Sequence, residues 1–322
     1  MTHSKANAQL NYLAPSVASS LFRNGKVFTH RDVFGNDDSH HGVIMEQRDI
    51  IINDARLLEP SASRRFDLHG FELQHQPLQF SSQQFFDQRQ VVQGYYPECT
   101  EIVRKGTNAS QVFAFDHNVR CPAGKDSDKR IAHGEQQVQG PIHYVHGDYT
   151  LTSAPQRLRD LAKPPGVNDT LRAVLDEGES LLTSEIVSQT LNEGKRFELI
   201  NVWRNIDHLP VMSDPLALCD GHSMSIDDLV VFEIHYHDRI GENYFAKYSP
   251  AHQWWYYPLM TRDEIILIKQ WDSSAGLGQA DGDENNNAPC TFSFHSAFKD
   301  LNTPANALER KSIEVRCIAF FD

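Results

Sequence analysis

The sequence predicts a mainly β fold with helical insertions, and two observations support this fold class. After residue 194, short segments rich in β-branched and aromatic residues follow one another, with Asp, Gly, Asn or Pro between them. Short strands at such regular spacing are typical of an antiparallel sandwich, jelly roll or barrel. Between residues 155 and 195, apolar residues instead recur at helical spacing. We therefore expect a β core that carries a helical insertion.

The predicted elements differ along the chain. The first 90 residues contain strand-like runs among polar loops, and we expect them to form an N-terminal extension packed on the core. The insertion at 155–195 is predicted to consist of two amphipathic helices, residues 152–165 and 169–194. The acidic segment 279–289 is predicted to be a loop. The predicted core strands are residues 196–205, 228–238, 242–249, 253–260, 264–273, 290–298 and 312–321.

Composition limits the partners of the chain. Thirty basic against 43 acidic residues give a formal net charge of -13, which argues against nucleic acid and against anionic membranes as partners. No segment reaches the run of about 20 apolar residues that a membrane helix needs, and the first residues are polar, so we expect a cytoplasmic protein. The five cysteines lack a C-x-x-C pair and are expected to be free thiols. We expect a single domain over residues 1–322, with a homodimer as the assembly to consider.

The segment "HYVHGDYT", residues 143–150, is the first candidate site. If residues 141–149 form a strand, side chains two positions apart share a face. His146 and Asp148 then point the same way, whereas His143 points to the other face. This geometry predicts His146 and Asp148 as a pair of metal ligands, with His143 beside them or in packing.

A His-x-Asp pair supplies two of the three ligands in the facial triad of non-haem Fe(II) oxygenases, and a distant histidine supplies the third. Among the 16 histidines, His295 lies in a predicted strand near the end of the β region. Arg310 and Arg316 follow it, and an arginine at that separation can hold the far carboxylate of a 2-oxo acid. The order of these residues fits a 2-oxoglutarate-dependent oxygenase.

Two alternatives remain open on the residues alone. His235, His237 and Glu242 have the spacing of a cupin metal site, although the glycines that flank cupin motifs are missing here. A strand with one solvent-exposed face would also explain the two histidines without any metal. The second alternative to the oxygenase, after the cupin-like metalloenzyme, is a non-catalytic accessory protein on the same fold.

Eight blocks of sequence, in the same order, resemble the AsaB and CmcJ type hydroxylase/desaturase family. Together they span about residues 90–321, which makes the set more specific than any single block. The blocks are "FDHNVR" (115–120), "HYVHGDYT" (143–150), "NVWRN" (201–205), "DPLALCDGHS" (214–223), "DLV" (228–230), "HQWWYYPLMTRDEIILIKQWDS" (252–273), "FHSAFKD" (294–300) and "RKSIEVRCIAFF" (310–321).

The resemblance implies a double-stranded β-helix core, of the jelly-roll or cupin-like type, that binds Fe(II) and 2-oxoglutarate. Carried onto this sequence, the iron ligands are His146, Asp148 and His295. The family's arginines fall on Arg310, Arg316 and Arg204, and the match does not decide which of the three holds 2-oxoglutarate. The chain departs from the family pattern next to these residues, where Gly147, Asn205 and Phe294 replace Asn, Pro and Pro.

The expected function follows from the resemblance. The enzyme oxidises a small organic substrate of secondary metabolism, such as a terpenoid, meroterpenoid or amino-acid derivative, with dioxygen, and releases succinate and CO2. Hydroxylation, desaturation, oxidative cyclisation and endoperoxide formation are the candidate outcomes. No catalytic group is expected beyond the metal site. Thr150 is a candidate contact to the co-substrate, and the candidate substrate-pocket residues are Trp203, Asn201, Tyr149 and His143.

Overall fold

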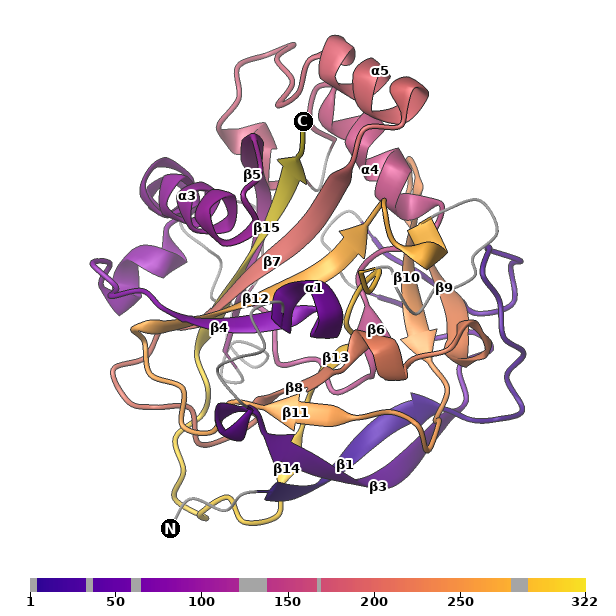
Figure 1. Cartoon of the computed structure of the whole chain (residues 1–322), viewed down its shortest axis with the longest axis vertical. Coiled ribbons are helices and arrows are strands. Elements are labelled where there is room, and N and C mark those ends of the chain that lie inside the picture. Colours follow the sequence, from indigo (N-terminus) through magenta and orange to yellow (C-terminus); the bar gives the residue numbers. More distant parts are fainter. Residues whose placement is uncertain (1–4, 33–36, 59–64, 122–137, 167–168, 279–288) are drawn as a thin grey trace.

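The computed structural model describes residues 5–32, 37–58, 65–121, 138–166, 169–278 and 289–322. The predicted loop 279–289 therefore lies almost entirely outside the described residues. Two β-sheets dominate the part of the chain that is described, which confirms the predicted mainly β class (Figure 1).

The larger sheet has ten strands and runs through the lower part of Figure 1. Its order is β14-β1-β3-β11-β8-β13-β6-β10-β9-β2. In chain order the strands are β1 (Lys5–Leu13), β2 (Phe28–His30), β3 (Met45–Asp54), β6 (His146–Gly147), β8 (Leu216–Cys219), β9 (Leu229–His235), β10 (Ile240–Ala246), β11 (Trp254–Tyr256), β13 (His295–Ala297) and β14 (Lys299–Asp300).

The smaller sheet has five strands in the order β4-β12-β7-β15-β5. These are β4 (Phe71–His75), β5 (Gln111–Arg120), β7 (Phe197–Asn205), β12 (Glu264–Asp272) and β15 (Ser312–Phe320). The strands β7, β12 and β15 match predicted segments closely. By contrast, predicted strand 290–298 reduces to three residues, and the predicted strand around residues 141–149 reduces to the two residues of β6.

The N-terminal residues contribute strands to both sheets. β1 pairs antiparallel with β3 along its whole length, and β3 in turn pairs in parallel with β11. β4 joins the edge of the smaller sheet beside β12. The N-terminal extension that we expect to pack on the core thus contributes β1, β2, β3 and β4 to its hydrogen-bonded sheets.

Five α-helices occur among the described residues, namely α1 (Arg65–His69), α2 (Gln88–Gln90), α3 (Tyr96–Thr107), α4 (Ser153–Leu161) and α5 (Ser184–Glu193). The predicted helix 169–194 is therefore helical only in its last part, where Thr183 accepts a hydrogen bond from the Ile186 amide and Gly194 ends the helix at φ 71°. A turn at Gly178, with φ 84°, interrupts the segment before α5.

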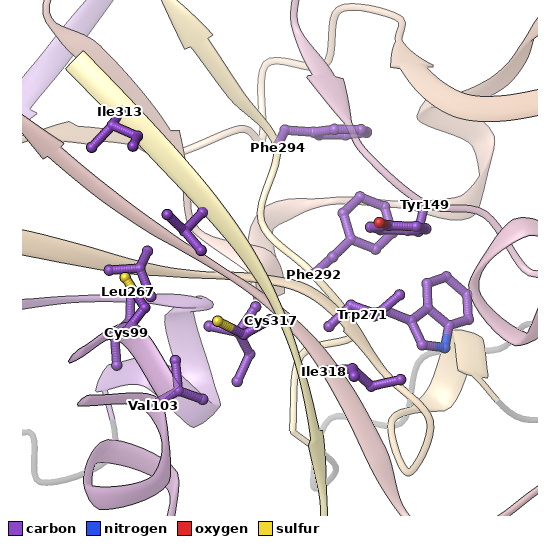
Figure 2. Close-up of a cluster of buried hydrophobic side chains, with 14 of the residues drawn as sticks. Cys99, Val103, Tyr149, Leu267, Trp271, Phe292, Phe294, Ile313, Cys317 and Ile318 are labelled. Carbon is purple, nitrogen blue, oxygen red and sulfur yellow. The ribbon is translucent and has the colours of Figure 1, made fainter. Parts of the chain in front are cut away.

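Both faces of the smaller sheet are covered, which is why every residue of β7 is buried. α3 packs on the outer face, and Figure 2 shows its Cys99 and Val103 opposite Cys317 of β15. On the other side of that strand, Figure 2 shows Trp271 and Phe292 in the layer between the sheets. Side chains on β7 and β15 therefore alternate between the layer against α3 and the layer between the sheets.

All five cysteines are buried free thiols, as the sequence predicts. Among the described residues, no helix is both long enough and apolar enough to span a membrane.

Candidate active site

His146, Asp148 and His295 lie together between the two sheets. The Oδ1 atom of Asp148 is 3.6 Å from Nε2 of His146 and 3.9 Å from Nε2 of His295. The two imidazole rings have their centroids 4.3 Å apart. One nitrogen or oxygen from each residue can be chosen so that all three atoms lie within 4.8 Å of one another. The three predicted ligands thus share one buried location.

Strand pairing explains how residues so distant in sequence meet. β6 and β13 are antiparallel neighbours, and their register places His295 directly opposite His146. Facing residues on neighbouring strands have Cβ atoms about 5 Å apart, so the two rings are forced into proximity. Asp148 follows the end of β6, where the chain turns towards the smaller sheet.

Hydrogen bonds hold two of the ligands in orientation. The Tyr144 carbonyl accepts a hydrogen bond from Nδ1 of His146 at 2.8 Å, so the lone pair on Nε2 faces the other two ligands. On Asp148, Oδ2 accepts hydrogen bonds from Asn201 (2.9 Å) and Arg316 (3.3 Å), which leaves Oδ1 for the histidines.

The electrostatics of the cluster favour a metal donor set. Burial, followed by the neighbouring His295, lowers the pKa of His146 to about 4, and burial also lowers the pKa of His295. Burial alone would raise the pKa of Asp148, but the positive charge of Arg316 and the hydrogen bond from Asn201 help to hold it well below its usual value. Near neutral pH the cluster offers two neutral imidazoles and one carboxylate, the donor set of the non-haem Fe(II) facial triad.

Gly147, one of the departures from the family pattern, has a packing explanation. A Cβ atom at this position would stand 2.9 Å from Cε2 of Phe292. The Phe292 ring cannot easily yield, because it stacks on Tyr244 on one side and on Trp271 on the other, and it is buried. The lack of a Cβ atom at Gly147, between the two predicted ligands, thus leaves room for the ring of Phe292.

The three predicted arginines are in different environments. Arg316 faces three carboxylates: Asp148, Asp116 (2.8 Å) and Glu314 (3.3 Å). Arg310 lies over the ring of Trp203, donates to the backbone carbonyl of Asp214 and is buried.

Arg204 is on the opposite face of β7 from Asn201 and Trp203, as strand alternation requires. Its guanidinium donates to the carboxylate of Glu98 in α3 (2.9 Å) and to the carbonyls of Gln76 and Arg262. The structure therefore places Arg204 against α3, in contact with the outer layer, and does not bring it to the cluster between the sheets.

Thr150, the candidate contact to the co-substrate, lies outside the strand that carries His146. The strand ends at Gly147, so alternation does not extend to this residue. Its hydroxyl donates to Glu242 (2.7 Å) and accepts from the amides of Thr152 and Ser153 at the start of α4. The contacts that the structure gives Thr150 are thus with Glu242 and with the turn that leads into α4.

The other predicted pocket residues divide into two groups. Asn201 contacts Asp148, and Trp203 shares its strand face, whereas Figure 2 places the ring of Tyr149 beside Phe292. His143 instead contacts Asp214, with Nε2 3.2 Å from Oδ1, as expected from its position on the other face.

Sequence reasoning missed Arg120 and Glu314. Arg120 ends β5, lies opposite Ser312 and donates to Gln139 and the Gly140 carbonyl. Within the described part of the chain, no carboxylate lies within ion-pair distance of Arg120 or Arg310, and burial lowers the pKa of both guanidinium groups. Alternation could have found Arg120, because Asp116 and Arg120 share a face in the block 115–120.

The cupin alternative is not favoured. His235 contacts Glu233 (2.9 Å), and Glu242 is held by Thr150 and lies 3.5 Å from Arg23. His237 is exposed in the turn between β9 and β10. These three residues do not converge on one point.

Comparisons with known proteins agree with this geometry. A family model described as "Oxidoreductase/YMDC permease-like domain" matches residues 10–320. The chain is similar to the alpha-ketoglutarate-dependent dioxygenase phiK of a fungal species (strain ATCC 74256), at 30% identity over 74% of this chain and 73% of the relative. It is also similar to the hydroxylase/desaturase efuI of Hormonema carpetanum, at 26% identity over 89% of this chain and 90% of the relative.

A solved structure with a similar fold is the iron and alpha-ketoglutarate-dependent endoperoxidase NvfI, with a TM-score of 0.73 and 21% identity. The alignment covers 99% of each chain, and it confirms the jelly-roll fold class. The resemblance inferred from the sequence blocks is likewise confirmed, because curated relatives carry the hydroxylase/desaturase name. The chain therefore belongs to the oxidoreductase/YMDC permease-like family and, within it, to the hydroxylase/desaturase group of Fe(II)- and 2-oxoglutarate-dependent dioxygenases.

Proposed function

We propose that this chain is an Fe(II)- and 2-oxoglutarate-dependent oxygenase whose iron is held by His146, Asp148 and His295. The observation that carries the proposal is the cluster of two buried histidines and one aspartate whose ligand atoms lie within 4.8 Å of one another. Bound there, Fe(II) supplies dioxygen activation coupled to decarboxylation of 2-oxoglutarate, and hence oxidation of a substrate C–H bond. The chain's own residues orient the ligands and exclude water.

We assign the far carboxylate of 2-oxoglutarate to Arg310. Arg310 is a buried guanidinium with no carboxylate partner among the described residues, and such a group favours an incoming anion, because charge-assisted hydrogen bonds are strongest where water is excluded. Trp203 beneath the guanidinium fixes its plane, and the Asp214 carbonyl uses only one of its donors. Arg120 lies close enough to lower the pKa of Arg310 further, so one anion would relieve the repulsion between the two cations.

Arg316 is better suited to positioning than to holding the far carboxylate. Its guanidinium already faces Asp148, Asp116 and Glu314, so a new carboxylate would have to displace existing partners. In this assignment Arg316 and Asn201 hold Asp148 so that Oδ1 is directed at the histidines. Loss of either would then disturb iron binding more than 2-oxoglutarate binding.

The substrate is a small organic molecule of secondary metabolism. Curated relatives are named for hydroxylation or desaturation, and a structural relative is an endoperoxidase. For this chain we propose a terpenoid, meroterpenoid or amino-acid derivative that lies near Trp203 and Tyr149. Hydroxylation, desaturation, cyclisation and peroxidation remain the four outcomes to be distinguished by product analysis.

The direct test of the iron assignment is titration of the metal-free chain with Fe(II) under nitrogen, followed by 2-oxoglutarate. A 2-oxo acid chelated to Fe(II) gives a visible charge-transfer absorption, which we expect in the wild-type chain and not in His146→Ala, Asp148→Ala or His295→Ala. His143→Ala is the matched control, because this nearby histidine contacts Asp214 instead of the cluster. Absorption that survives His295→Ala would refute the assignment.

Three further expectations also stay proposals: a single domain over residues 1–322 with the helical insertion at 155–195, a homodimer, and a cytoplasmic location. The way β1 and β3 join the larger sheet supports the single domain. Ile44 and Ile51, exposed at the beginning and middle of the β3 region, are a surface that a second copy could cover. Light scattering of the purified chain tests the dimer.

A further inference from the structure

A second group of potential metal ligands lies at the edge of the larger sheet that is formed by β2. His30, Asp38 and His41 each offer one ligand atom, and these atoms lie within 4.8 Å of one another. Asp38 Oδ2 is 3.2 Å from Nδ1 of His30 and 3.9 Å from Nε2 of His41. Ligand atoms around a tetrahedral ion with bonds of about 2.1 Å are about 3.4 Å apart. We infer that these three residues form a second, surface site for a divalent transition metal.

The backbone brings the three side chains together. Chain segments 28–31 and 37–41 form a hairpin, in which the amides and carbonyls of Phe28 and His41 bond to each other and the Asp38 amide bonds to the His30 carbonyl. His30 is on the first arm of this hairpin, while Asp38 and His41 are on the second. A bound ion would therefore connect the two arms.

The carboxylate of Asp38 is already oriented for this role. Its Oδ1 atom accepts hydrogen bonds from the Thr29 hydroxyl and from the His30 amide, each at 3.0 Å. Oδ2 is thereby directed at the two imidazoles. The ring of His41 is held as well, because it stacks on Phe28 with centroids 4.5 Å apart and an angle of 15°. Fixed ligands lose little freedom on binding an ion.

His235 is in position to support the other three. β2 runs parallel to β9 with His30 beside His235, and the two rings lie 5.3 Å apart. Nε2 of His235 is 2.9 Å from Oε2 of Glu233, whose other oxygen accepts the amides of Asn24 and Gly25. A carboxylate that orients a histidine in this way is typical of the surroundings of metal ligands.

The donor set selects the class of ion. Two imidazoles with one carboxylate suit Zn²⁺, Co²⁺, Ni²⁺ or Cu²⁺, whereas Ca²⁺ and Mg²⁺ require more oxygen ligands. The side chains of His30, Asp38 and His41 are each about half exposed, at 56%, 46% and 45%, so an ion can reach them directly from solvent. This site is separate in residues from His146, Asp148 and His295 and does not depend on the proposed iron chemistry.

The test is Zn²⁺ binding by equilibrium dialysis with elemental analysis, in a chain that carries His146→Ala and His295→Ala. Removing the proposed iron ligands separates the two sites, so the result does not depend on whether the iron assignment is correct. We expect this double variant to bind one Zn²⁺ per chain and to lose it when His30→Ala and His41→Ala are added. His235→Ala should raise the Kd by about 10- to 100-fold.

Two controls keep the result interpretable. His40→Ala removes a neighbouring histidine that packs on Tyr144 and Phe232, and it should leave the stoichiometry unchanged. Circular dichroism in the presence of a chelator should show that His30→Ala and His41→Ala fold as the parent does. In addition, the Co²⁺ form should have the intense visible bands of a four-coordinate ion. Zn²⁺ binding that persists without His30 and His41, or no binding in the His146→Ala, His295→Ala chain, would overturn the inference.

Discussion

At the scale of single residues, the two-residue spacing of His146 and Asp148 predicts their proximity better than the expected secondary structure does. The prediction of His146 and Asp148 assumes a strand over residues 141–149, yet within that range only His146 and Gly147 are in a strand. The two-residue spacing still placed Asp148 beside His146, because the chain turns towards the smaller sheet after Gly147. Strict strand alternation predicts that Arg204 lies on the opposite face of the sheet from Asn201 and Trp203.

The contact between Gly147 and Phe292 gives the first prediction. Gly147→Ala should lower the free energy of unfolding by about 1–3 kcal/mol, because the new methyl group overpacks against a fixed aromatic ring. Urea unfolding measures this. Phe292→Leu clears the space that the methyl group needs but is itself destabilising, so the cost of Gly147→Ala should be smaller when it is measured in the Phe292→Leu background. Equal stability of Gly147→Ala and the wild type would mean that the ring moves freely.

The two buried arginines give the second prediction. Arg310→Gln should weaken 2-oxoglutarate binding by about tenfold or more, since a desolvated charge-assisted pair contributes roughly 1.5–3 kcal/mol. Its affinity for Fe(II) should be nearly unchanged. The matched variant Arg204→Gln should leave 2-oxoglutarate affinity intact and instead destabilise the fold by about 2–4 kcal/mol, because Glu98 loses its buried partner.

Calorimetric titration with 2-oxoglutarate, together with urea unfolding of both variants, separates these effects. A loss of 2-oxoglutarate affinity in Arg204→Gln with normal stability would reverse the assignment. A fully functional Arg310→Gln chain would move the role to Arg120 or Arg316.

At the scale of elements, the long strands were predictable and the short ones were not. β7, β12 and β15 are nine residues long and rich in apolar and aromatic residues, because both of their faces are mostly buried. β6 and β13 are too short to produce a pattern, and pairing with neighbouring strands alone defines them. The helix expected over 169–194 fails at Gly178, where the backbone adopts positive φ.

The packing of α3 on β5 gives the third prediction. The hydroxyl of Tyr96 in α3 lies 2.9 Å from Nδ1 of His117 in β5, and burial lowers the pKa of His117 from 6.5 to about 4. Since the folded chain keeps this histidine neutral while the unfolded chain protonates it, stability is full above pH 6.5 and falls as the pH drops towards 4. A shift of this size corresponds to about 3 kcal/mol.

Urea unfolding between pH 7 and pH 4 measures the effect against His117→Gln, which keeps an acceptor for Tyr96 but cannot be protonated. The variant should lose less stability than the wild type over this range, by up to the same amount. Parallel curves for the two chains would contradict the prediction.

At the scale of the whole molecule, the cluster of His146, Asp148 and His295 joins the two sheets. The histidines belong to β6 and β13 of the larger sheet, while Asp148 is bonded to Asn201 and Arg316 of the smaller one. The fold class could be predicted because a β-rich composition and turn residues recur along the chain. The division into ten and five strands could not, because it depends on pairings between distant segments such as β3 with β11.

This link between the sheets gives the fourth prediction. Fe(II) at one hundred times its Kd should stabilise the native chain by about 2.7 kcal/mol, because the metal binds the folded state alone. Thermal unfolding under nitrogen, with and without a chelator, measures the shift in Tm. The increase should disappear in Asp148→Ala and persist in His143→Ala. An equal shift in both variants would indicate binding elsewhere.

The topology of the larger sheet also constrains the order of events during synthesis on the ribosome. β1 and β3 are synthesised early and can pair with each other at once. The other neighbour of β1 is β14, and the other neighbour of β3 is β11, and both of these strands are synthesised much later. The hairpin of β1 and β3 therefore emerges with unpaired edges long before the strands that cover them are made. Such edges are exposed to pairing with other chains until the C-terminal third has been translated. Slow translation of that last third should accordingly lower the yield of native protein.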